Sequence, residues 1–128
     1  MLILVIDDDD RVRQTVVLMV EELGHEVIQA DSGATGIALF QSESPHLVLT
    51  DIIMPDKEGI ETIGEIKAVN PQTKIIAMSG GGRIKNTDFL KLALANGADA
   101  VLAKPFDEEE LAGAILKVMG DEYHPART

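Results

Sequence analysis

Residues Leu47–Gly59 read LVLTDIIMPDKEG. The stretch begins with an apolar run that has the length of a strand, and Asp51 follows this run directly. The chain contains four more runs of similar length, and the first, third and fourth of the five are almost continuously apolar. Such runs are typical of strands buried on both faces of a parallel sheet. The five runs are Leu2–Ile6, Glu26–Ala30, Leu47–Thr50, Lys74–Met78 and Ala100–Ala103.

Longer amphipathic stretches between these runs predict five helices. The first should end at Gly24, the second should run from a Ser32 cap through Phe40, and the third should stop before Pro71. Thr87 can cap the fourth helix, and Asp107 with Glu110 has the spacing of a capping box for the fifth. The apolar positions expected on buried helix faces are Val12, Val16, Met19, Val20, Leu23, Ile60, Ile63, Ile66, Phe89, Leu92, Ala93, Leu111, Ile115, Val118 and Met119.

Five strands that alternate with five helices predict an α/β domain with a doubly wound, five-stranded parallel sheet. Right-handed crossovers then place helices on both faces of the sheet. The length of 128 residues fits one domain. We expect this domain to span residues 1–120, with a short polar tail at residues 121–128 that frays.

Composition excludes several classes of protein. The chain has no cysteine, which excludes disulfides and thiolate metal sites, and its net charge of -11 argues against direct binding to nucleic acid. The first apolar run is too short for a signal peptide or a membrane span. We therefore expect a cytoplasmic protein with no membrane contact.

Polar residues stand at the ends of four of the five runs. Asp7 and Asp8 follow the first run, Asp51 the third, Ser79 the fourth and Lys104 the fifth. The carboxyl ends of parallel strands lie along one edge, and ligands bind there, where the strand order reverses. With strand order 2-1-3-4-5, this point falls between strands one and three, so the three aspartates should converge.

Three neighbouring carboxylates remain ionised together only if a cation neutralises them. All-oxygen ligation favours a hard cation such as Mg2+, and a lysine and a hydroxyl at the same edge supply the other groups that phosphoryl transfer needs. Each residue also has a simpler explanation. Asp9 and Asp10 are best interpreted as helix-capping residues, Asp51 could be a turn residue, and Ser79 and Lys104 are uninformative alone. The occurrence of the acidic residues, the hydroxyl and the lysine together at four strand ends favours a functional site over these separate explanations.

Four segments resemble the receiver domain of two-component response regulators, which has a flavodoxin-like fold. The resemblance covers Met1 to about Gly120 and is most specific in LVLTDIIMPD. The segments are Leu2–Asp9 (LILVIDDD), Leu47–Gly59 (LVLTDIIMPDKEG), Ile75–Gly80 (IIAMSG) and Gly97–Phe106 (GADAVLAKPF).

The resemblance implies a role for each polar residue. Asp51 would be the phosphoacceptor, and Ser79 and Lys104 would contact the phosphoryl group. The bond from Lys104 to Pro105 would be cis. The Mg2+ ligands would be Asp7, Asp8, Asp51 and the backbone carbonyl of Ile53.

The resemblance also implies partners. The phosphoryl donor would be a phosphohistidine on a sensor histidine kinase or a histidine phosphotransfer protein. A downstream protein would bind the face formed by the fourth helix, fifth strand and fifth helix. The sequence does not decide whether phosphorylation also produces a homodimer.

Three positions depart from the family pattern. Ser79 and residue 101 would be the switch residues, but Val101 replaces the usual aromatic side chain, so a ring rotation cannot relay the signal. Ile53 and Gly81 occupy two positions that tune dephosphorylation in the family. Neither side chain can orient an attacking water, so the phosphoryl group should be long-lived.

Three other interpretations of the sequence are weaker. Asp7 and Asp9 resemble the nucleophile motif of haloacid-dehalogenase-like phosphatases, but Arg11 replaces the usual residue. No acidic pair on a later strand follows Lys104, because Glu108–Glu110 stand at the start of a helix. A flavin-binding protein would need aromatic residues that a chain with 3% aromatic content lacks. A receiver domain that has lost phosphorylation and acts only as an interaction module would not need all five of Asp7, Asp8, Asp51, Ser79 and Lys104.

Overall fold

The computed structural model describes residues 1–52, 59–79 and 87–120, and only the backbone of residues 87–90. Five parallel strands form one sheet in the order β2-β1-β3-β4-β5, as the sequence predicted. The strands are β1 (Leu2–Ile6), β2 (Glu26–Ala30), β3 (Leu47–Asp51), β4 (Lys74–Ser79) and β5 (Ala100–Ala103).

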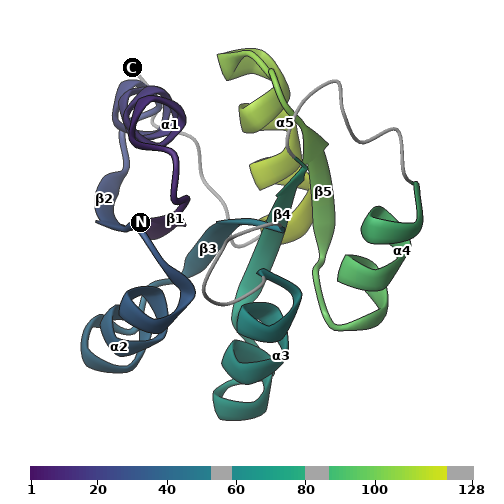
Figure 1. Cartoon of the computed structure of the whole chain (residues 1–128). Coiled ribbons are helices and arrows are strands. Elements are labelled where there is room, and N and C mark those ends of the chain that lie inside the picture. The colour runs from purple at the N-terminus through teal and green to yellow at the C-terminus, as the bar shows by residue number, and fades with distance from the viewer. Residues whose placement is uncertain (53–58, 80–86, 121–128) are drawn as a thin grey trace.

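Five helices cover the two faces of this sheet (Figure 1). Helices α1 and α5 pack on one face, and α2, α3 and α4 pack on the other. This three-layer arrangement is the doubly wound fold that alternating strands and helices predict. The helices are α1 (Asp10–Glu22), α2 (Gly33–Glu43), α3 (Gly59–Val69), α4 (Thr87–Ala95) and α5 (Glu108–Met119).

Strand side chains divide alternately between two hydrophobic clusters. In β1, Ile3 and Val5 face α1 and α5, whereas Leu4 and Ile6 face the helices of the other layer. All four side chains are fully buried. Because successive side chains of a strand point to opposite faces, a central strand covered on both sides must be apolar throughout.

Polar caps define the helix ends near the strand termini. The Asp9 carboxylate accepts hydrogen bonds from the backbone N–H groups of Arg11 and Val12 and begins α1. Gly24 follows α1 with a φ of 91°, which glycine adopts without steric cost. The predicted Ser32 cap and the Asp107–Glu110 capping box are also confirmed.

Some predicted boundaries were wrong by a few residues. Asp51 and Ser79 are the last residues of β3 and β4 rather than the residues that follow them, because ladder pairing continues to both. Helix α2 continues past Phe40 to Glu43 and ends at Ser44, which has a φ of 49°.

The predicted buried face of α4 was partly wrong, because Ala93 is buried but Leu92 is 48% exposed. The predicted cap of Thr87, the side chain of Phe89 and the tail at 121–128 lie outside what the structure describes. Among the described segments, no helix combines the length and the apolar character needed to cross a bilayer.

Candidate functional site

Strand register brings Asp7 and Asp51 together at the carboxyl edge of the sheet. Ile6 of β1 pairs with Thr50 of β3, so the residues that follow them, Asp7 and Asp51, lie at the same level of the sheet. Asp7 continues the alternation of Ile3 and Val5 toward the layer of α1 and α5. Asp51 continues that of Leu47 and Leu49 toward the same layer. The two carboxylates therefore meet on one face, between the strands where the strand order reverses.

Asp7 is fully buried, and its backbone and side-chain polar atoms are all engaged. Its N–H donates to the Ala30 carbonyl (3.1 Å), and its own carbonyl accepts from Arg13 Nη1 (2.9 Å). Its Oδ1 accepts from the Asp9 N–H (3.0 Å), and its Oδ2 accepts from Lys104 Nζ (2.6 Å). A buried carboxylate is tolerated only when it is paired and hydrogen-bonded in this way.

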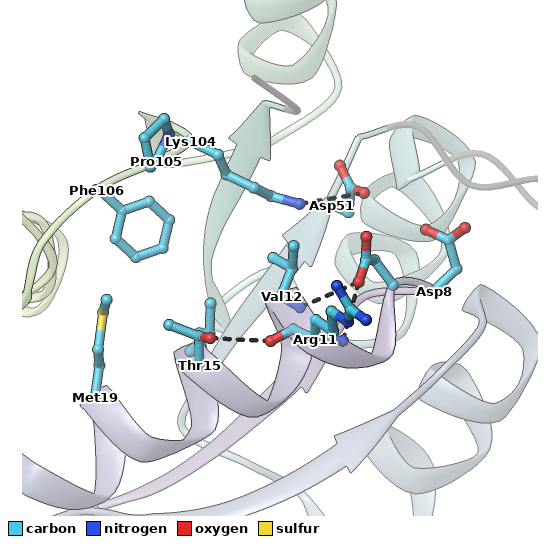
Figure 2. A pocket seen from close by; sticks show the side chains of 11 residues that line it. Asp8, Arg11, Val12, Thr15, Met19, Asp51, Lys104, Pro105 and Phe106 are labelled. Atoms are coloured by element: carbon cyan, nitrogen blue, oxygen red, sulfur yellow. Dashed lines mark hydrogen bonds and ion pairs between the residues drawn. The ribbon is translucent and has the colours of Figure 1, made fainter. Parts of the chain in front are cut away.

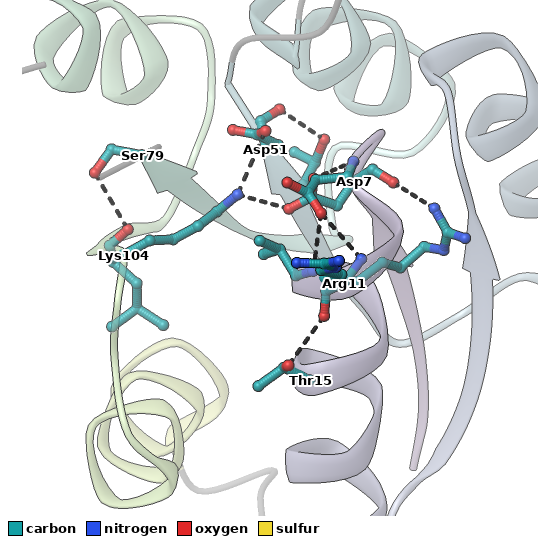
Figure 3. Close-up of polar contacts among 11 residues, drawn as sticks. Asp7, Arg11, Thr15, Asp51, Ser79 and Lys104 are labelled. Carbon is teal, nitrogen blue, oxygen red and sulfur yellow. Dashed lines mark hydrogen bonds and ion pairs between the residues drawn. The ribbon is translucent and has the colours of Figure 1, made fainter. Parts of the chain in front are cut away.

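Lys104 connects the end of β5 to this acidic pair (Figure 3). Its Nζ lies 2.6 Å from Asp7 Oδ2 and 3.4 Å from Asp51 Oδ2, and its side chain is 11% exposed. The Lys104 N–H donates to the Ser79 carbonyl (3.0 Å), which ties the start of the loop to β4. The peptide bond from Lys104 to Pro105 is cis, as the resemblance implied.

Asp7, Asp8 and Asp51 form a group that could hold a metal ion. One carboxylate oxygen of each lies within 4.8 Å of the others. Asp7 and Asp51 are buried, whereas Asp8 is exposed, so the group opens to solvent on one side. Carboxylate oxygens with room for several waters are the donors that Mg2+ prefers, so these residues fit that ion. The predicted contribution of the Ile53 carbonyl lies outside the described residues.

The two predicted switch residues lie on β4 and β5. Ser79 is buried, and its hydroxyl donates a long hydrogen bond of 3.5 Å to the Leu102 carbonyl of β5. Val101 is half-buried on β5 and packs against the cluster under α2, α3 and α4, on the opposite face from Asp51. Gly81 lies outside the described residues.

A pocket of about 590 Å³ opens beside these groups (Figure 2). One wall comes from α1, with Val12, Thr15 and Met19, and the other from the loop after β5, with Pro105 and Phe106. Asp8, Asp51 and Lys104 line its polar end. The site therefore has an apolar, solvent-accessible surface directly beside its charged groups.

Sequence reasoning missed two features that hold Asp51. The hydroxyl of the fully buried Thr50 donates to the Asp51 carbonyl (3.1 Å). Gly59 begins α3 so close to β3 that a Cβ on it would lie 1.8 Å from that carbonyl oxygen. A glycine at a helix start is too common a signal to reveal this contact, which depends on the packing of α3 against β3.

Sequence reasoning also missed Arg13, whose guanidinium binds the Asp7 carbonyl. A signal was present in the sequence, because Arg13 precedes the buried residues Val16, Val17 and Val20 at helical spacing. A charged residue on an apolar helix face usually has a specific partner.

Comparison with known families agrees with this geometry. The family model described as the response regulator receiver domain matches residues 3–116. The chain belongs to this family. It is thus a two-component response regulator domain, of a family that acts in signal transduction.

Individual relatives of this receiver domain differ in length. The chain is 34% identical to the response regulator receiver protein CpdR of Brucella abortus, covering 91% of this chain and 95% of CpdR. It is also 34% identical to the DNA-binding transcriptional regulator NtrC of Azospirillum brasilense, but it spans only 25% of that protein. The family therefore includes both short receivers and receivers within longer regulators.

Solved structures share the fold of this receiver domain. A crystal structure of a response regulator receiver domain protein from Clostridium thermocellum superposes with a TM-score of 0.85. Its sequence is 32% identical, and the match covers 94% of this chain and 95% of that one. The flavodoxin-like, five-stranded architecture that the sequence predicted is thus the family's own.

Proposed function

We propose that this receiver domain accepts a phosphoryl group on Asp51 in a Mg2+-dependent reaction and transmits the change to a partner protein. An Asp51 carboxylate oxygen attacks phosphorus as the bond between phosphorus and the donor's histidine nitrogen breaks. The donor nitrogen keeps the electron pair of the broken bond. A carboxylate can act as such a nucleophile and form an acyl phosphate.

The position of the Lys104 ammonium is the observation that supports this proposal most. The ammonium lies within 3.4 Å of carboxylate oxygens on both Asp7 and Asp51. Phosphoryl transfer needs a nucleophile, a cationic clamp on the phosphoryl oxygens and a metal at the same place. A phosphoryl group on Asp51 would bring new anionic oxygens within reach of the ammonium, which could exchange its bond to Asp7 for one to phosphate.

Asp7, Asp8 and Asp51 would hold the Mg2+ ion, with the Ile53 carbonyl as a further ligand. When bound, the ion neutralises charge on the transferring phosphoryl oxygens. Asp7 contributes a carboxylate held rigidly by its neighbours, whereas the exposed Asp8 leaves the site open to solvent. Both properties suit an ion that keeps several of its waters.

Ser79 would provide the conformational response. Its present bond to the Leu102 carbonyl is long at 3.5 Å, so moving the hydroxyl toward a phosphoryl oxygen loses little energy. This movement would release a link between β4 and β5 and shift the balance between two shapes of the α4–β5–α5 face. Val101 would accompany the change without the rotation of an aromatic ring.

The domain would have two kinds of protein partner, a phosphoryl donor and a downstream target. The donor would be a phosphohistidine on a sensor histidine kinase or a phosphotransfer protein, and it would approach Asp51 from the open side of the pocket. The receiver catalyses much of its own modification, so acetyl phosphate should also serve as donor. The downstream protein would read the α4–β5–α5 face, with a homodimer formed on phosphorylation as one possible product.

Intact mass after incubation with acetyl phosphate tests the proposal. The protein should gain one phosphoryl group with Mg2+ and none with a chelator. Asp51→Ala should abolish the gain, and Asp31→Ala, which removes an exposed aspartate at the same sheet edge, should retain it. No gain under any condition, or an equal gain in the Asp51→Ala variant, would refute the assignment.

A further inference from the structure

The guanidinium of Arg13 links three elements beside the acidic group. Its Nη1 donates to the Asp7 carbonyl at the end of β1 (2.9 Å). Its Nε donates to Gln29 Oε1 on β2 (3.0 Å), and its Nη2 donates to Asp10 Oδ1 at the start of α1 (2.6 Å). The Arg13 side chain is only 12% exposed. A planar fork with five N–H donors is the only side chain that can make these three contacts in fixed directions.

The bond to Asp7 has a consequence for Asp8. The Asp7 carbonyl and the Asp8 N–H belong to one planar peptide group. A hydrogen bond that holds the carbonyl therefore also fixes the orientation of the Asp8 N–H. Asp8 is exposed, so burial does not restrain its side chain. The anchored peptide therefore restrains the direction of Asp8 relative to Asp7, whose position is already set by Lys104 and by the Asp9 N–H.

We propose that Arg13 is a positioning residue for the carboxylate pair Asp7 and Asp8, and that it increases Mg2+ affinity through the Asp7 carbonyl. This inference rests on the metal site of the proposed function. Groups that orient metal ligands without touching the metal commonly change affinity by roughly 10- to 100-fold when removed. Arg13 differs from the usual case because it holds a backbone carbonyl rather than a ligand side chain.

The charge of Arg13 predicts the opposite effect on Mg2+ affinity. A guanidinium bonded to the Asp7 carbonyl places a positive charge near the metal group and lowers the local attraction for a cation, so removing it should tighten Mg2+ binding if charge alone mattered. The pair with Asp10 contributes little to stability, because Asp10 is 81% exposed. The sign of the affinity change therefore separates positioning from simple electrostatics.

Mg2+ titration of Arg13 variants, followed by amide NMR shifts, tests the proposal. Arg13→Met should weaken Mg2+ binding by on the order of tenfold, although it removes a positive charge. Arg13→Lys keeps the charge but loses the fork, so its affinity should be intermediate. Arg11→Met, the matched control on the exposed side of α1, should leave the affinity equal or slightly tighter.

A second measurement separates positioning from general loss of stability. Thermal unfolding without Mg2+ gives the stability of each variant, and Ile115→Val, a core substitution in α5, provides a destabilised control with normal Mg2+ affinity. If Arg13→Met fails to fold, the Mg2+ affinity of Arg13→Lys relative to the wild-type protein still tests the proposal. Wild-type or tighter Mg2+ affinity in the folded Arg13 variants would overturn the proposal and leave the proposed function intact, whereas no Mg2+ binding by the wild-type protein would overturn both.

Discussion

Lys104 Nζ lies 2.6 Å from Oδ2 of Asp7, a residue 97 positions earlier in the chain. The same nitrogen lies farther from the proposed phosphoacceptor, at 3.4 Å from Asp51 Oδ2. The ammonium thus compensates the fully buried carboxylate first and the acceptor second. A cation bound among the carboxylates would compete for the same negative charge, so Lys104 is coupled to the metal site as well as to the phosphoryl group.

Lys104→Met should destabilise the protein most strongly without Mg2+. Removing one member of a buried ion pair leaves the Asp7 charge uncompensated and should lower the free energy of unfolding by about 3 kcal/mol. Saturating Mg2+ should recover part of this loss, because the ion replaces the missing positive charge. Urea unfolding with and without Mg2+ measures both effects, with the exposed Lys117→Met on α5 as control. An identical loss in the two conditions would contradict the coupling.

Gly59→Ala should displace the backbone at Asp51. The added Cβ would lie 1.8 Å from the Asp51 carbonyl oxygen and 2.7 Å from the Ile52 Cα, and neither backbone atom can move freely. We expect a loss of roughly 1–3 kcal/mol in stability, as for other overpacked sites. We also expect slower phosphorylation by acetyl phosphate.

Gly64→Ala is the matched control in the same helix. Its Cβ would have no neighbour within 4 Å, so the helix should gain about 0.5–1 kcal/mol. Chemical denaturation and the time course of intact mass measure stability and reactivity of both variants. Equal phosphorylation rates for Gly59→Ala and Gly64→Ala would show that the close approach of α3 does not position Asp51.

The lifetime of the phosphorylated form should be long. Ile53 and Gly81, which lie outside the described residues, offer no polar side chain to orient a hydrolytic water. An Ile53→Asn, Gly81→Glu double variant should therefore lose its phosphoryl group faster than the wild-type protein. Intact mass measured over time after removal of the donor gives both half-lives, and a wild-type half-life no longer than the variant's would contradict the prediction.

The stability of the fold should fall as the pH decreases below about 6.5. Burial, and then the positive charge of the N-terminus, lower the pKa of His25 below its ordinary value of 6.5. The unfolded chain therefore takes up the proton at higher pH than the folded chain. The contribution of neutral His25 to stability is complete above the unfolded pKa and is lost as the pH falls toward the folded pKa.

Urea unfolding at several pH values tests this sign. As the pH falls from neutral to below the pKa of His25 in the unfolded chain, the wild-type protein should lose more stability than the His25→Gln variant. Carboxylates contribute to both proteins, so the difference between the two curves isolates His25. Parallel curves would show that protonation of His25 is not linked to folding.

The amino-acid sequence by itself determined the strands, most helix boundaries and the identity of the polar residues at the strand ends. These features depend on local physics: alternation along a strand, periodicity along a helix and capping within a few residues. Asp9, Ser32 and the Asp107–Glu110 pair could be recognised for this reason.

Tertiary structure alone decided which of these groups touch. Lys104 could have paired first with either aspartate, and the long bond from Ser79 to the Leu102 carbonyl has no signature in the sequence. The contact of Gly59 with Asp51 and the three bonds of Arg13 arise where α3 and α1 pack against the sheet. Such contacts join residues whose distance depends on strand order and helix position, so neither periodicity nor capping can predict them.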